Sequence, residues 1–272
     1  MIFETYIPSY PLNQFIESFV YFKDYNPTHT VDRFLPDGNV NIVIDLTDFP
    51  KFIYDNLTLK EIQSCRNIWF SGIRNKYITI PSGRDSEMFI INFHKGKAYP
   101  FVEMPMNELT DYVVDGELIM SNEILNMREA MLQLATIKQK FNYGEQYLLK
   151  VFGSKLTVNP FIDYSVNSIL KSPQQLAINN LSHKVGFSQK HFIKIFKSHV
   201  GVTPKAFLRI IRFQKAILQI EANRTADWTS IAYESGYFDQ AHFINDFKNF
   251  SGFTPEQYLR SKSNFTNYVA VG

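Results

Sequence analysis

Side chains that can recognise the edges of DNA bases occur in two sets, at matching positions in the C-terminal part of the chain. The sets are Gln189, Lys190, Ile193 and Lys194, and then Gln240, Ala241, Ile244 and Asn245. Lysine can donate to guanine O6 and N7, asparagine can pair with adenine N6 and N7, and an apolar side chain can meet a thymine methyl group. We therefore interpret Lys194 as a guanine reader and Asn245 as an adenine reader.

Further cations near these sets are suited to phosphate oxygens, whose contacts position a protein on DNA without reading its sequence. We expect phosphate contacts from Lys197 and Lys205. We also count Arg209, Arg212 and Lys248 among the DNA-binding residues. The alternative for each lysine is a solvated surface charge or a phosphate contact that carries no sequence information.

The distribution of charge along the chain favours a polyanionic partner for the C-terminal part. Residues 1–159 hold 15 basic and 19 acidic residues, whereas residues 160–272 hold 13 and 7, so a net charge of +2 hides a basic half. Residues 164–220 contain nine basic residues and no acidic one, while residues 221–260 contain three basic and six acidic residues. Because affinity for DNA grows with the number of cations that neutralise phosphates, we predict that the first of these segments anchors the chain.

An internal repeat contains both sets of base-reading residues. Residues 181–208 and 231–259 match at these positions: Gly186-Phe187 with Gly236-Tyr237, His191-Phe192-Ile193 with His242-Phe243-Ile244, Phe196-Lys197 with Phe247-Lys248, and Gly201, Thr203 and Pro204 with Gly252, Thr254 and Pro255. In each copy a glycine can end one helix with a positive φ, and Ser188 or Asp239 can cap the next. Each copy therefore predicts a helix-turn-helix, whose second helix suits the major groove.

These motifs resemble the AraC/XylS family of transcription regulators over residues 160–262. The family pattern of Gly-Phe, a capping Ser or Asp, Phe-Lys and Gly-x-(Ser/Thr)-Pro is present twice, and residues 207–216 fit the linker-helix signature. The resemblance implies two three-helix subdomains that place recognition helices in successive major-groove segments. The family usually has Arg two residues before Phe-Lys, where this chain has Lys194 and Asn245, and lysine lacks the planar bidentate fork of arginine.

The N-terminal part has the pattern of short strands followed by helices. Alternation of polar and β-branched residues over 39–45, and apolar runs over 68–73, 77–80 and 87–93, predict strands up to about residue 105. Helices are expected over 107–112, 121–134 and 141–152. We expect an α+β domain, with a strand-rich barrel or sandwich followed by helices.

Two domains are expected, with a boundary at Asn159-Pro160. Residues 1–158 would form a sensor or regulatory domain, and residues 159–264 an all-α AraC-type domain of two helix-turn-helix subdomains. The expected parts of the second domain are a first subdomain over 160–206, a linker helix over 205–221 and a second subdomain over 222–262. One face of the helix over 121–134 is apolar, and we interpret it as intramolecular core, with a homodimer seam as the alternative; its residues are Ile124, Met127, Met131 and Leu134.

The function that these features predict is sequence-specific binding of double-stranded DNA by a transcription regulator, controlled by an effector or a protein contact at the N-terminal domain. Five aromatic residues could line an effector pocket or fill the core, and we favour the core for each: Trp69, Phe70, Tyr77, Phe89 and Phe93. RNA polymerase and a second copy of the chain are further candidate partners. The alternative function is an interaction adaptor with weak DNA binding.

Several other classes of function lack support in the sequence. We expect no cofactor, no metal site and no catalytic residue, and we interpret His191 and His242 as packing or phosphate-side residues. Arg66 could lower the pKa of the single cysteine, Cys65, but a DNA-alkylation-responsive enzyme has no other support. No apolar run approaches the roughly 20 residues of a membrane helix, so we expect a cytoplasmic protein without membrane contact.

Overall fold

The computed structural model describes residues 1–272 except 103, 121–122, 175–177, 223–226, 263–264 and 272. Its N-terminal half is built on two antiparallel sheets, which confirms the strand-rich prediction in its sandwich form; the described strands do not form a closed barrel. Sheet A has the order β1-β2-β9-β4-β7-β10 and consists of β1 (Ile2–Tyr6), β2 (Ile16–Lys23), β9 (Glu87–Phe93), β4 (Asn41–Asp45), β7 (Ile68–Ser71) and β10 (Val113–Asp115). Sheet B has the order β11-β3-β8-β5-β6 and consists of β11 (Tyr268–Val271), β3 (Val31–Phe34), β8 (Ile78–Pro81), β5 (Lys51–Tyr54) and β6 (Glu61–Cys65).

The two faces of sheet A have different roles, because successive side chains of a strand point to opposite faces. Phe89, Ile91 and Phe93 of β9 are fully buried on the outer face. Met88 and Ile90 lie on the inner face, toward sheet B, where they line a cavity. The same alternation explains why Phe70 belongs to the core while its neighbour Trp69 lines the cavity.

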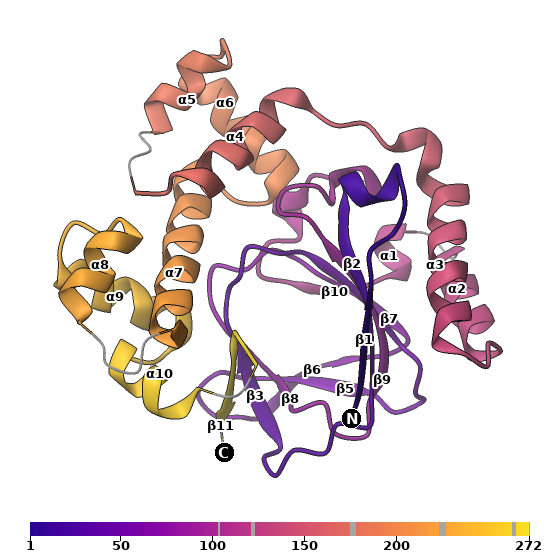
Figure 1. The fold of residues 1–272 in the computed structure, drawn as a ribbon. Coiled ribbons are helices and arrows are strands. Elements are labelled where there is room, and N and C mark those ends of the chain that lie inside the picture. The colour runs from indigo at the N-terminus through magenta and orange to yellow at the C-terminus, as the bar shows by residue number, and fades with distance from the viewer. Residues whose placement is uncertain (103, 121–122, 175–177, 223–226, 263–264, 272) are drawn as a thin grey trace.

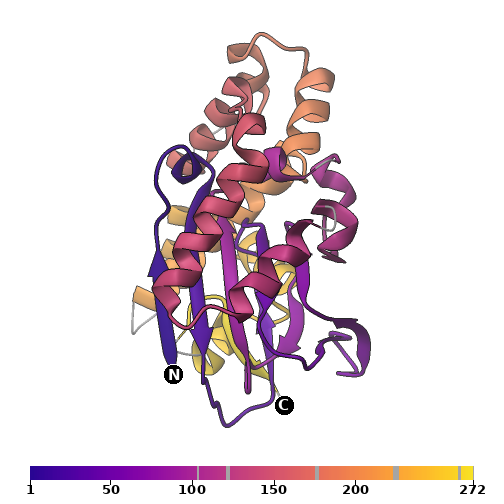
Figure 2. The same ribbon diagram turned by 90° about the vertical axis from the view of Figure 1, so that its right-hand side faces the viewer.

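Helices cover the outer face of sheet A, as Figure 2 shows from the side. They are α1 (Glu117–Met120), α2 (Glu123–Leu132) and α3 (Ile137–Phe152). Ile124, Met127 and Met131 of α2 are at most 2% exposed, so this helix face is intramolecular core, as interpreted from the sequence. The prediction of a helix over 107–112 was wrong, since only the 3₁₀ turn Met106–Glu108 forms there.

The third expected helix begins four residues earlier than the sequence suggested. Thr136 accepts a hydrogen bond from the Gln139 backbone N–H, and the Gln139 side chain accepts one from the Thr136 N–H. This capping box satisfies backbone donors that a helix N-terminus leaves free. The start of α3 is therefore fixed at Ile137 rather than near Phe141.

The helical half contains two similar groups of helices around one long helix (Figure 1). Its elements are α4 (Pro160–Lys171), α5 (Ile178–Lys184), α6 (Gln189–Val200), α7 (Pro204–Ala222), α8 (Trp228–Ser235), α9 (Gln240–Ser251) and α10 (Pro255–Ser261). The long linker helix α7 buries Phe207, Ile210, Phe213, Ile217 and Ile220. None of the described helices is long and apolar enough to cross a membrane.

After α10 the chain returns to the N-terminal half. Strand β11 pairs antiparallel with β3, with Tyr268 opposite Phe34 and Val271 opposite Val31. Figure 1 shows this yellow strand beside β3. The sequence analysis did not predict this strand, which joins the two halves of the chain in one sheet.

Candidate nucleic-acid interface and cavity

The first candidate recognition helix is α6, and its cap was predicted from the sequence. Ser188 accepts a hydrogen bond from the His191 N–H at 3.3 Å, and Gly186 ends the preceding segment with φ +73°. One face of α6 is buried through Phe192 and Phe196. The opposite face exposes four of the five predicted residues, Gln189, Lys190, Lys194 and Lys197, while Ile193 is half-buried.

The second candidate recognition helix, α9, repeats this arrangement. Asp239 accepts from the His242 N–H at 2.7 Å, and Gly236 ends α8 in the left-handed conformation. Phe243 and Phe247 are fully buried. Four predicted residues of this copy are exposed, Gln240, Ala241, Asn245 and Lys248, while Ile244, like Ile193 in the first copy, is half-buried.

The two repeated histidines pack against aromatic rings in equivalent ways. His191 meets the edge of Phe187 at 4.9 Å between ring centroids, and His242 meets Tyr237 at 5.3 Å. Both contacts join the start of a recognition helix to the turn before it. Among the described residues, no group of three or more His, Cys, Asp and Glu lies together as metal ligands would.

The two arginines of the linker helix have internal partners, which changes their assignment. Arg209 donates through Nε and Nη2 to Asp246 of α9, at 3.1 and 2.6 Å. The hydrogen bond to Asp246 raises the pKa of Arg209. Arg212 donates through Nε to the Pro173 carbonyl at 2.8 Å, and burial lowers its pKa. We therefore replace their predicted DNA contacts with structural roles, whereas Lys205 is exposed at the start of α7.

The role of Asp246 was missed by the sequence analysis, which counted it only as an acidic residue. It lies on the buried side of α9 and is 5% exposed. The signal that could have found it is the absence of any acid from residues 164–220, because an arginine of that segment can form an ion pair only with a carboxylate from elsewhere in the chain.

Each Gly-x-Thr-Pro motif forms a corner that contacts the N-terminal half; we call residues 201–204 the first corner and 252–255 the second corner. The Thr110 hydroxyl donates to the Gly201 carbonyl at 2.6 Å. The Tyr77 N–H donates to the carbonyl of Phe250, just before the second corner, at 3.1 Å. The short segment between β7 and β8 contacts both corners, because Ile73 packs against Gly201 and Tyr77 against Gly252.

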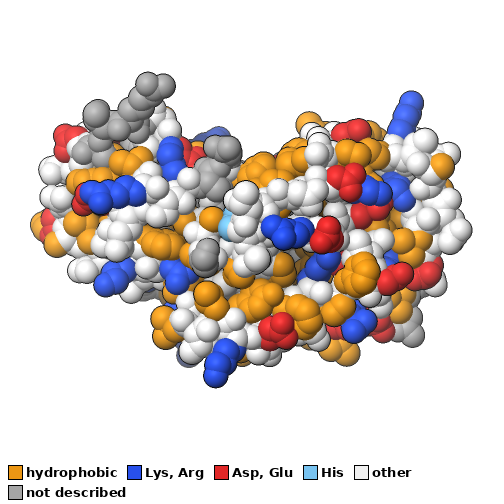
Figure 3. Space-filling model, turned by 90° about the horizontal axis from the view of Figure 1, so that it is seen from below, with side chains coloured by type: hydrophobic (Ala, Val, Ile, Leu, Met, Phe, Trp, Pro, Cys, Tyr) orange, Lys and Arg blue, Asp and Glu red, His pale blue; other side chains and the backbone are white. Residues whose placement is uncertain are grey.

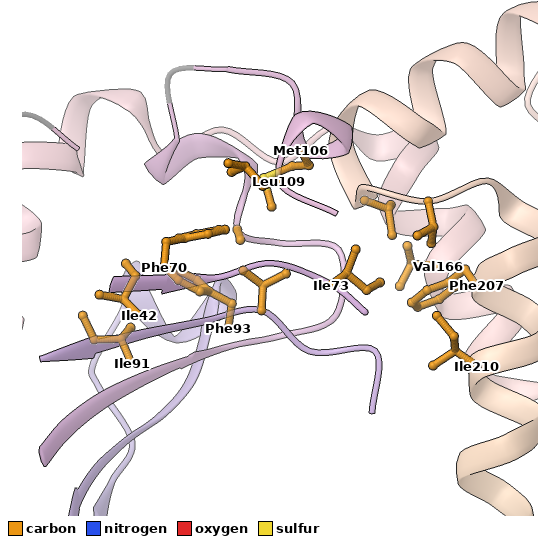
Figure 4. Packing of buried hydrophobic residues seen from close by; sticks show 14 of the residues in the cluster. Ile42, Phe70, Ile73, Ile91, Phe93, Met106, Leu109, Val166, Phe207 and Ile210 are labelled. Carbon is orange, nitrogen blue, oxygen red and sulfur yellow. The ribbon is translucent and has the colours of Figure 1, made fainter. Parts of the chain in front are cut away.

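Packing between the halves is continuous from the outer core of sheet A to α7. Figure 4 shows Ile73 between the sheet residues, such as Phe93, and the residues Val166 and Phe207 of the helical half. Elsewhere in the contact between the halves, the Arg33 guanidinium lies over two rings. Its Cζ is 4.5 Å from the ring centroid of Tyr77 and 4.6 Å from that of Phe253. The underside of the molecule in Figure 3 carries Lys and Arg scattered among acidic and hydrophobic side chains.

A cavity of about 450 Å³ lies between the two sheets. Its lining is mostly apolar and includes Val43, Trp69, Ile78, Ile80, Met88 and Ile90. Two buried polar atoms at this lining, Asn41 Oδ1 and Ser82 Oγ, have no hydrogen-bond partner in the described structure. Of the five aromatic residues considered for a pocket, only Trp69 lines this cavity; Phe70, Phe89 and Phe93 are core, and Tyr77 contacts the second corner.

The single cysteine also lines the cavity, and its environment opposes reactivity. Burial raises the pKa of the Cys65 thiol to about 11. Asp115 raises this pKa further, while Arg74, rather than Arg66, acts in the opposite direction. The suggestion that Arg66 lowers the pKa of Cys65 was therefore wrong, and the thiol is protonated at neutral pH.

A family model described as a helix-turn-helix domain matches residues 181–261, which run from α5 to α10 through both copies of the repeat. This match identifies residues 181–261 as an AraC-type helix-turn-helix domain. A second model, described as a domain of unknown function (DUF6597), matches residues 4–115.

Curated relatives match part of the length of the chain. An uncharacterized HTH-type transcriptional regulator of Haemophilus influenzae is 36% identical over 97 residues, 35% of this chain and 32% of the relative. One of Staphylococcus aureus is 28% identical over 145 residues, 52% of this chain and 18% of the relative. The chain thus spans a third or less of the length of these relatives. Among solved structures, ToxT from Vibrio cholerae is 10% identical with a TM-score of 0.48, covering 96% of this chain and 98% of that one.

Proposed function

We propose that this DNA-binding regulator recognises a specific DNA sequence and that a small effector in the cavity between the sheets controls its affinity. The observation that carries the first part is the duplicated, capped helix whose outward face bears basic, amide and small side chains. The observation behind the second is a cavity that falls within the roughly 300–1,000 Å³ range of ligand sites. On this proposal the protein acts in the cytoplasm, where it contacts RNA polymerase at a promoter. It binds DNA as a monomer or as a homodimer.

The proposed DNA contacts divide the predicted residues by role. Lys194 and Asn245 would read bases, with Gln189, Lys190, Gln240 and Ala241 beside them in the groove. Ile193 and Ile244 are half-buried, so each would meet a thymine methyl group only through the exposed part of its side chain. Lys197, Lys205 and Lys248 would bind phosphates, and Arg209 and Arg212 would hold the subdomains in place.

The cavity supports an effector that is largely apolar and carries a hydrogen-bond donor. Aromatic and aliphatic side chains dominate its lining. Asn41 Oδ1 is an acceptor without a partner, and burying such an atom unpaired costs roughly 1–3 kcal/mol. A ligand donor at this point would recover that cost, and the Ser82 hydroxyl offers a second anchor.

The test is binding of the full chain to a labelled duplex selected from a random library, measured by fluorescence anisotropy over a potassium chloride series. We expect tighter binding to the selected duplex than to a scrambled one. Lys194→Ala should weaken the selected duplex by about tenfold or more and the scrambled duplex much less. Lys138→Ala, which removes an exposed lysine of α3, is the matched control and should change neither.

Two results would contradict the proposal. Equal affinity for the selected and scrambled duplexes would remove sequence-specific recognition. Loss of all DNA binding at physiological salt, with a protein partner retained, would instead support the adaptor function.

A further inference from the structure

One segment of the chain contacts both the cavity and the linker helix; we call residues 265–271 the tail. On one side the tail is a wall of the cavity, through Phe265, Thr266 and Tyr268. Phe265 meets the ring of Tyr25 edge-on at 5.5 Å, and Tyr268 lies 4.9 Å from Phe34. A ligand in the cavity would therefore touch side chains of the tail.

On its other side the tail is hydrogen-bonded to α7 at two points. The Gln214 amide donates to Asn267 Oδ1 at 2.8 Å and to the Pro36 carbonyl at 2.7 Å. The Thr266 hydroxyl donates to Glu221 Oε2 at 2.7 Å. Because Gln214 and Glu221 are seven residues apart, they lie on the same face of the helix.

Glu221 also joins the tail to the last helix. Its second oxygen, Oε1, accepts a hydrogen bond from the Tyr258 hydroxyl of α10 at 2.7 Å. The bridge between Lys262 and Val269 connects the end of α10 to β11. The tail, α7 and α10 are therefore linked in one hydrogen-bonded group.

Among the described segments that line the cavity, the tail is the one that is hydrogen-bonded to α7 of the helical half. The lining residues lie either within 3–113 or in the tail, and none of those described belongs to α4–α10. The linker helix sets the separation of α6 and α9, since it follows the first corner and precedes α8. A shift of the tail would thus reach the element that positions both recognition helices.

We propose that the tail carries cavity occupancy to the linker helix and so couples the effector to DNA binding. This rests on the proposed function. The competing route is the segment between β7 and β8, which joins cavity-lining strands to both corners.

The experiment uses N-phenylnaphthylamine, a neutral apolar fluorophore, as the cavity probe. Its binding is followed by fluorescence, and DNA binding by anisotropy with and without saturating probe. The variant Gln214→Ala/Glu221→Ala removes both ties to the tail without altering the cavity lining. Leu218→Ala, at an exposed residue of the same helix, is the matched control.

In the unaltered chain and in Leu218→Ala, we expect the probe to change DNA affinity by about fivefold or more, the lower end of usual coupling. In the double variant we expect probe binding to stay within about twofold, while the effect on DNA affinity falls below about twofold. Hydrogen exchange adds a second measurement: the probe should slow exchange of the backbone amides of 268–271.

Distinct results would overturn distinct claims. If the double variant keeps the full effect of the probe, the tail does not carry the coupling, and the β7–β8 segment becomes the route. If the probe binds but leaves tail exchange and DNA affinity unchanged, the coupling itself is refuted. Failure of the unaltered chain to bind DNA, or to bind the probe, would refute the proposed function instead.

Discussion

Asp246, on the buried side of the second recognition helix, receives two hydrogen bonds from the guanidinium of Arg209 on the linker helix, at 2.6 and 3.1 Å. This pair joins α9 to α7 through charge-assisted hydrogen bonds. The Cζ atom of Arg209 also lies 5.4 Å from the ring centroid of Phe250, so the cation has an aromatic contact on α9 as well. The contact between α7 and α9 thus includes a cation supplied by α7.

Removing this pair should reduce stability rather than DNA contact. The Asp246 side chain is 7% exposed, and Arg209→Ala would leave it with only His242, whose Nε2 lies 4.0 Å from Oδ2. We expect a loss of about 2–3 kcal/mol in the free energy of unfolding, less than for a fully buried pair, because the arginine is partly solvated. Urea unfolding measures this. Lys205→Ala, on the exposed face of the same helix, should change stability by less than about 0.5 kcal/mol and instead weaken DNA binding. If Arg209→Ala instead weakens DNA binding and leaves stability unchanged, Arg209 is a DNA contact after all.

Phosphate and base contacts should differ in their dependence on salt. Lys197→Ala should lower the slope of log affinity against log salt by about one, with similar losses for all duplexes. Asn245→Ala should leave that slope unchanged and relax preference at one base pair. Anisotropy on the selected and scrambled duplexes distinguishes the two effects. If Lys197→Ala leaves the slope unchanged, the Lys197 side chain is a solvated surface charge that does not contact phosphate.

Glycines offer a way to separate backbone strain from contact between the halves. Gly186 and Gly252 have nearly equal φ, +73° and +74°, but a Cβ at Gly186 meets nothing within 4 Å. At Gly252 it would lie 2.7 Å from Tyr77 Cε1. We expect Gly186→Ala to cost about 1–2 kcal/mol from backbone strain alone and Gly252→Ala clearly more. Thermal and urea unfolding measure the difference, and equal costs would mean that the second corner is not held against Tyr77.

Cys65 should behave as a buried, protonated thiol. Since its folded pKa of about 11 lies above the value in an unfolded chain, folding favours the protonated form. Its contribution to stability is fully present below the unfolded pKa and is lost as pH rises toward 11. Modification by a disulfide reagent at pH 8 should be at least about tenfold slower in the folded chain than in urea. Rapid reaction of the folded chain would reopen the question of a reactive cysteine.

Local signals in the sequence allowed the helical half to be predicted, and long-range pairing explains what was missed. Ser188 and Asp239 act on amides three residues away, so their caps could be recognised from spacing alone. The start of α3 is also encoded locally, by the capping box of Thr136 and Gln139, which lies before the apolar pattern that predicted the helix. Strand β11 could not be predicted, because its partner β3 lies at the other end of the chain. The pairing of Arg209 with Asp246 is likewise set by how two helices cross, which spacing alone does not determine.

The pairing of β11 with β3 has a consequence for synthesis of the chain. Since β11 follows α10, one edge of sheet B stays unpaired on the ribosome until the whole helical half has been made. An open strand edge is a template for pairing with other chains. Nascent or heat-shocked protein should therefore be most prone to aggregate along β3, and the helical half must emerge before that edge is protected.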